Sequence, residues 1–93
     1  MILSFADRDT QQLYREDICP ARWRAFRASA VRKLDMVHAA VGLDDLRSPP
    51  GNRLEALKAD RKGQFSIRIN QQWRICFRWT ENGAEHVEIV DYH

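Results

Sequence analysis

The sequence predicts an α+β fold in which two N-terminal helices pack on a curved antiparallel β-sheet. In the first half of the 93-residue chain, apolar residues recur at steps of three or four, which is the period of a helix. After residue 64 they alternate with polar residues, which is the period of a strand. The segment SPPGN at residues 48–52 separates the two patterns. A chain of this length is close to the commonest domain size, so we expect residues 1–93 to form a single domain.

The first half is predicted to contain a short strand near residues 2–5 and two helices. The first helix covers residues 7–16, with Asp7 as its N-cap. The second covers residues 20–41, with a proline in its first turn and Gly42 at its end. Its core-facing stripe consists of Trp23, Phe26, Ala30, Leu34, Val37 and Val41.

The second half is predicted to contain four strands. Residues 53–58 form the first, residues 65–69 and 73–79 form a hairpin, and residues 86–90 form the last. The Asn-Gly pair at residues 82–83 is a strong hairpin signal, because both turn positions favour a positive φ. The alternation gives the hairpin one apolar face and one cationic face.

The composition is that of an ordinary folded chain, with 44% hydrophobic and 30% charged residues. No apolar run is long enough to span a membrane, and residues 1–7 lack the basic flank of a signal peptide. Cys19 and Cys76 have no short-range partner, so they form neither a disulfide framework nor a zinc site. We therefore expect a cytoplasmic protein with no membrane contact.

Positive charge is concentrated in one part of the chain. Residues 51–80 carry seven Lys or Arg against two acidic residues, whereas residues 81–93 carry none against four. Arg68, Arg74 and Arg78 should project from the same side of the hairpin. This face either binds a polyanion such as a phosphate backbone, or is a solvated face with cross-strand ion pairs to Glu88 or Asp91. The pattern leaves both interpretations open.

Motifs for nucleotide loops, zinc sites and serine-type triads are absent from the sequence. The last three residues, Asp91, Tyr92 and His93, can each move a proton, but a terminal trio is a weak signal by itself.

Several segments together resemble a known family. They are SPPGNRLEALK at residues 48–58, GQ at 63–64, SIRIN at 66–70, WRICF at 73–77 and VEIVDYH at 87–93. Their succession resembles the HigB toxins, also called plasmid-maintenance killer proteins, within the RelE/ParE superfamily. The resemblance implies a single toxin domain of two helices on an antiparallel sheet. It also implies an endoribonuclease that enters the A site of the 70S ribosome and cuts mRNA during translation. It further implies a HigA-type helix-turn-helix antitoxin, with operator DNA contacted only through the antitoxin complex.

The resemblance also implies a set of catalytic residues. Asp91, Tyr92 and His93 take the positions of the terminal active-site residues, and Arg74 and Lys58 match the family's Arg and Lys. We expect His93 to transfer protons, Asp91 to position it or share the transfer, and Tyr92 to stack on a base. Arg74 would stabilise the phosphate in the transition state. The expected RNA-binding residues are Lys58, Arg68, Arg53, Arg78, Arg61 and Lys62, and no metal or cofactor is expected.

Glu55 departs from the pattern of some family members. They carry a histidine in this segment that takes part in cleavage, and many others carry the sequence found here. Glu55 is therefore a candidate second acid or base, and an ion pair with Lys58 or Arg53 is the alternative.

Two other functions remain open at this point. A ParE-like member of the superfamily would inhibit DNA gyrase, although gyrase inhibition needs no general base at the terminus. A non-catalytic protein would bind RNA or the ribosome through the same cationic face.

Overall fold

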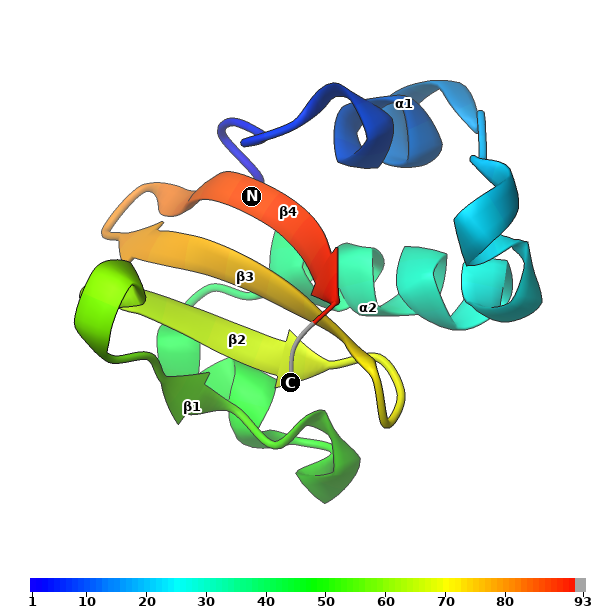
Figure 1. Cartoon of the computed structure of the whole chain (residues 1–93). Helices are drawn as coiled ribbons and strands as arrows, with labels where there is room; N and C mark the ends of the chain where they lie inside the picture. Colours follow the sequence, from blue (N-terminus) through cyan, green and yellow to red (C-terminus); the bar gives the residue numbers. More distant parts are fainter. Residues whose placement is uncertain (92–93) are drawn as a thin grey trace.

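The computed structural model describes residues 1–91 of the chain and has the predicted α+β architecture (Figure 1). The α-helices are α1 (Arg8–Glu16) and α2 (Arg27–Ala39). Short 3₁₀ helices are η1 (Ala21–Phe26), η2 (Leu43–Arg47), η3 (Pro50–Asn52) and η4 (Ala59–Arg61). The strands β1 (Glu55–Ala56), β2 (Gln64–Arg68), β3 (Trp73–Thr80) and β4 (Gly83–Asp91) form one antiparallel sheet in the order β1-β2-β3-β4.

Helix α1 ends at Glu16, as predicted, and it begins with the predicted cap. The Asp7 carboxylate accepts a hydrogen bond from the backbone N–H of Thr10 at 3.0 Å, which satisfies one of the free donors of the first turn. Thr10 and Leu13 are the buried residues of this helix. Among residues 1–91, no helix is long and apolar enough to cross a membrane.

The prediction of one continuous helix over residues 20–41 is wrong. A 3₁₀ segment, η1, comes first, and α2 begins only at Arg27 after Phe26 leaves helical geometry. The reason is aromatic packing on the sheet. The ring of Phe26 stacks on the ring of Trp73 with their centroids 5.4 Å apart, and the ring of Trp23 packs edge-on against Trp73 at 6.3 Å. At the other end α2 stops at Ala39, and Val41 is 90% exposed rather than part of the core.

The predicted hairpin is confirmed, and in its register Ile67 pairs with Ile75 and Phe65 with Phe77. The first predicted strand of the sheet, residues 53–58, is reduced to the two residues of β1, because Arg53 takes a left-handed conformation with φ 46°. The last strand is longer than the predicted residues 86–90.

The N-terminal residues do not form a regular strand, but they cover the outer edge of β4. The backbone N–H groups of Leu3 and Ala6 donate to β4 carbonyls at 2.7 and 2.9 Å. Gly83 allows the close approach of this segment, because a Cβ there would lie 2.1 Å from the Met1 carbonyl oxygen. Further along, the backbone N–H of Ile89 donates to Thr10 Oγ1 at 3.1 Å. The strand that leads to the C-terminus is therefore held by β3 on one side and by residues 1–10 on the other.

The hydrophobic core lies between the sheet and α2, which crosses behind the sheet in Figure 1. Its fully buried members include Ala30, Leu34 and Val37 from α2 and Ile67, Ile75, Phe77 and Val87 from the sheet. The intervening strand residues point to the opposite side of the sheet. We call this side the polar face; its strand residues are Glu55, Gln64, Ser66, Arg68, Arg74, Cys76, Arg78, Thr80, Glu85, Glu88 and Val90.

Candidate functional site

The strand register brings the side chains of the polar face into cross-strand rows. Glu55, Ser66, Cys76 and Glu88 are paired in succession across the four strands. In the neighbouring row, Arg74 lies between Arg68 and Val90. Residues far apart in the sequence therefore meet around one arginine.

Groups from two other segments hold Arg74. Its Nε donates to Ser66 Oγ at 2.8 Å, and its Nη2 donates to the backbone carbonyl of Arg53 at 2.7 Å. The same Nη2 lies 3.5 Å from Glu55 Oε1. Only 12% of the Arg74 side chain is exposed. The guanidinium consequently has a fixed orientation, which a flexible surface arginine lacks.

Glu55 is thus paired differently from the sequence expectation. The expected partners were Lys58 or Arg53, whereas the carboxylate pairs with Arg74, and Arg53 contributes its carbonyl to the same guanidinium. The pairing follows from register, because Glu55 lies opposite Ser66, and the Ser66–Cys76 pair is two residue pairs from the Arg68–Arg74 pair, on the same face of the sheet.

A second ion pair on the polar face joins Arg61 to Glu88. Arg61 Nη1 lies 3.3 Å from Glu88 Oε2 and donates to Gln64 Oε1 at 3.0 Å. Glu88 or Asp91 was the alternative partner for the hairpin arginines, and Glu88 instead contacts an arginine from the loop between β1 and β2. Arg61, predicted to bind RNA, is therefore already paired with a carboxylate.

Cys76 lies beneath these charged side chains and is fully buried. Burial raises the pKa of its thiol to about 11; Glu88 and Glu55 also raise the pKa, and Arg61 and Arg74 oppose them. The thiol therefore stays protonated at neutral pH, which suits a residue that fills space.

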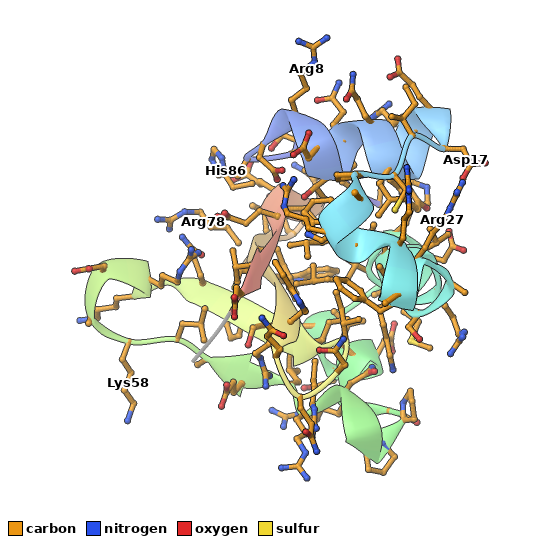
Figure 2. The ribbon with its side chains drawn as sticks, turned by 45° about the vertical axis from the view of Figure 1, so that its right-hand side comes forward. Arg8, Asp17, Arg27, Lys58, Arg78 and His86 are labelled. Carbon is orange, nitrogen blue, oxygen red and sulfur yellow. The ribbon has the colours of Figure 1, made fainter. Side chains whose placement is uncertain are left out.

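The remaining predicted RNA-binding residues differ in how they are placed. Arg68 lies directly opposite Arg74, and its Nε donates to the carbonyl of Asn70 at 3.0 Å. Lys58 and Lys62 are exposed at the two ends of η4. Figure 2 shows Lys58 and Arg78 extending outward on the same side of the molecule, away from Arg27. Of this set, Arg68 is the cation that the strand register places next to Arg74.

Of the three terminal residues, the structure describes Asp91 only. It pairs with Trp73, and its Oδ2 accepts a hydrogen bond from Gln72 Nε2 at 3.0 Å. It is therefore Val90, and not Asp91, that lies opposite Arg74 in the sheet. Tyr92 and His93 lie outside the described residues.

Sequence reasoning missed Ser66 and Asn52. Both are fully buried polar residues. Ser66 could have been found from the pairing of the hairpin, which places it diagonally next to Arg74. Nothing in the local pattern around Asn52 predicts its burial.

The chain is similar to known toxins over most of its length. Residues 3–93 match the family model described as RelE-like toxin of type II toxin-antitoxin system HigB. The chain is 41% identical to Toxin HigB-1 of Vibrio cholerae serotype O1 over 88 residues, covering 90% of each protein. It is 39% identical to Endoribonuclease HigB of Proteus vulgaris over 41 residues, which cover 44% of this chain and 45% of that protein.

The fold is also similar to a solved structure. A chain of the YoeB-YefM complex from Staphylococcus aureus superposes with a TM-score of 0.62, covering 100% of this chain and 98% of that one. At 16% sequence identity, this likeness concerns the fold alone.

Proposed function

The chain belongs to the HigB family of RelE-like toxins of type II toxin–antitoxin systems, and on that premise we propose that it is an endoribonuclease that cuts mRNA in the ribosomal A site. The observation that carries the proposal is the guanidinium of Arg74, which Ser66 and the Arg53 carbonyl hold on the polar face, with Arg68 directly opposite in the sheet. The relative named Endoribonuclease HigB supports an RNA-cutting activity.

Cleavage of RNA through its 2′-hydroxyl needs a base, a group that stabilises the phosphorane-like transition state, and an acid for the leaving 5′-oxygen. Arg74 is proposed as the stabilising group. A donor held in place before the reaction is worth about 2.7–4 kcal/mol in comparable sites, because it needs no reorganisation when charge develops. The contacts from Ser66 and Arg53 provide that preorganisation.

Proton transfer is assigned to residues around the end of β4 and to β1. We propose His93 as the main proton-transfer group, Asp91 as the residue that positions it or shares the transfer, and Tyr92 as a stacking surface for a base. Glu55 is a second candidate base. Its Oε1 lies 3.5 Å from Nη2 of Arg74, so the carboxylate is next to the group proposed to stabilise the phosphate.

RNA binding is assigned to cations at the edge of the polar face. Lys58, Lys62, Arg68, Arg78 and the Arg53 side chain would contact the phosphate backbone, which makes affinity fall with increasing salt. Arg61 contributes less in this proposal, since binding a phosphate would compete with its contact to Glu88.

Family membership also implies a partner. We propose that a HigA-type helix-turn-helix antitoxin neutralises the toxin and that operator DNA is bound only through that complex. The YoeB-YefM complex supports an antitoxin as partner for this fold.

The order in which synthesis stops after induction tests the proposal. An mRNA-cutting toxin stops protein synthesis before DNA synthesis, whereas a gyrase inhibitor affects DNA synthesis first. Pulse-labelling of both polymers is therefore the measurement, with His93→Ala as the paired variant. We expect His93→Ala to abolish growth arrest while antitoxin binding and melting stay close to wild type. Growth arrest by His93→Ala with continued mRNA cutting would contradict the role given to the terminus.

A further inference from the structure

Asn52 is buried in the connection between α2 and β1, and its amide is fully engaged. Its Nδ2 donates to the carbonyls of Leu46 at 3.2 Å and Ser48 at 3.3 Å. Its Oδ1 accepts a hydrogen bond from Lys33 Nζ. These contacts use both donors of the amide and its oxygen, with no side-chain surface left to solvent.

The residue that follows is the one that holds Arg74. Arg53 has a φ of 46°, a left-handed conformation that costs a non-glycine residue on the order of 1–2 kcal/mol. Such a conformation persists only where the surroundings impose it. The backbone N–H groups of Asn52 and Arg53 donate to Pro49 at 2.9 Å and Pro50 at 3.1 Å. In this conformation the Arg53 carbonyl accepts from Arg74 Nη2 at 2.7 Å.

Lys33 connects this loop to the helical side of the molecule. It lies on α2, and burial lowers the pKa of its amine. A partly buried ammonium is favourable only with a hydrogen-bond acceptor, and the Asn52 oxygen supplies one. A continuous series of contacts therefore runs from Lys33 through Asn52 and the Arg53 backbone to Arg74.

We propose that Asn52, together with Lys33, is a positioning residue of the RNA-cutting site. It holds Arg53 in the left-handed conformation that directs the Arg53 carbonyl at Arg74, and it thereby fixes the guanidinium that binds the reacting phosphate. The inference rests on the proposed function for its catalytic consequence, but the geometric part stands independently. Asn52 acts through Arg53 and Arg74 and does not touch the RNA.

The geometric part is tested by nuclear magnetic resonance of the Arg74 guanidinium, assigned by loss of its signals in Arg74→Lys. In the wild type, the hydrogen bond from Nη2 should slow rotation about the Cζ–Nη2 bond. In Asn52→Ala that rotation should become fast. Val37→Ala is the matched control, because it also removes buried atoms beside α2 but makes none of these contacts. Slow rotation in Asn52→Ala, or equally fast rotation in Val37→Ala, would overturn the proposal.

The catalytic part is tested by single-turnover cleavage of mRNA on translating ribosomes, below the melting temperature of every variant. Displacement of a catalytic group by about 1 Å costs up to about 100-fold in rate. Asn52→Ala should lose rate on that order with little change in the concentration needed for half-maximal cleavage. A wild-type protein that cuts no RNA would refute the proposed function, and the resonance experiment would still decide the positioning role.

Arg53→Gly separates positioning from a general loss of structure. Glycine keeps the carbonyl and reaches the left-handed region without strain. If Asn52 acts by holding that conformation, Asn52→Ala should cost much less rate in the Arg53→Gly background than in the wild type. Equal losses in both backgrounds would indicate a merely structural role. If Asn52→Ala does not fold, Lys33→Met removes one contact of Asn52 and should give a smaller loss in the same direction; no change in Lys33→Met would then count against the proposal.

Discussion

The two faces of the same four-stranded sheet are held in different ways. Toward α2, the strands present Ile67, Ile75, Phe77 and Val87, all fully buried among other apolar side chains. On the polar face, Ser66 is as deeply buried, but it lies beneath charged side chains and accepts a hydrogen bond from Arg74. One face is held by apolar packing, and the other by hydrogen bonds and ion pairs.

The two faces therefore differ in how much they contribute to the stability of the fold. Burying one large apolar side chain stabilises a fold by about 1.5–3 kcal/mol, whereas an ion pair with a half-exposed carboxylate, such as Glu55 with Arg74, contributes about 0–1 kcal/mol. The polar face therefore adds little to the free energy of unfolding. It fixes the positions of charges, and this is what a phosphate-binding site needs.

The largest effect on stability should come from the helix-facing side. Phe77→Ala leaves a cavity in the core and should lower the free energy of unfolding by about 3–5 kcal/mol. Urea denaturation measures the loss, with Ile75→Val as a milder change of about 0.5–1.5 kcal/mol on the same face. A loss below about 1 kcal/mol for Phe77→Ala would break the distinction between the two faces.

The largest effect on activity should come from Arg74→Lys. Lysine keeps the charge but cannot contact Ser66, Arg53 and Glu55 with one planar group. We expect the rate of mRNA cleavage to fall by about 100- to 1,000-fold. The free energy of unfolding should fall by about 1.5–3 kcal/mol, the usual value of a hydrogen bond to a charged group and less than the loss expected for Phe77→Ala. A variant that loses stability and activity in parallel would contradict the separation.

Thr10→Val sharpens the comparison, because it removes a hydrogen bond between helix α1 and strand β4. The backbone N–H of Ile89 would lose its acceptor in a buried place, at a cost of about 1–3 kcal/mol. Thr10→Ser keeps the hydroxyl and should restore most of that loss. Equal unfolding curves for Thr10→Val and the wild type would show that this contact does not hold β4.

The smallest effect concerns pH. Burial and the hydrogen bond to Asp35 raise the pKa of Tyr14 from 10.0 to about 12. The folded state holds this proton more tightly than the unfolded state. The contribution of Tyr14 to the free energy of unfolding is therefore complete below pH 10 and is lost as the pH rises toward 12. The wild type should therefore lose stability relative to Tyr14→Phe across that window. A Tyr14 phenol that titrates near its ordinary value would contradict the assignment.

Local patterns predicted the elements that depend on neighbouring residues. The alternation in residues 65–79 predicted the hairpin and its two faces, and the position of Asp7 before an amphipathic segment predicted a cap. The helix break at Phe26 could not be predicted in this way. It depends on Trp73, which is nearly 50 residues away in the sequence and is brought close only by the tertiary fold.

The sequence predicted which charged residues lie on the polar face, but not which of them contact one another. The sequence indicated a cationic face with Arg74 on it, whereas the partners of Arg74 depend on the register of β1 against β2 and on the backbone of Arg53. The family resemblance supplied the roles of Tyr92 and His93, which remain predictions. Asn52 emerged only from the structure, because its importance depends on burial and not on a motif.

The central claim is that the polar face cuts mRNA on the ribosome through Arg74. Mapping mRNA 5′ ends on translating ribosomes, with purified wild type, Arg74→Lys and the core variant Val37→Ala, tests it most directly. The account predicts new 5′ ends within A-site codons for the wild type and Val37→Ala, and their near absence for Arg74→Lys. Equal cleavage by Arg74→Lys, or the same ends on mRNA that is not being translated, would contradict it.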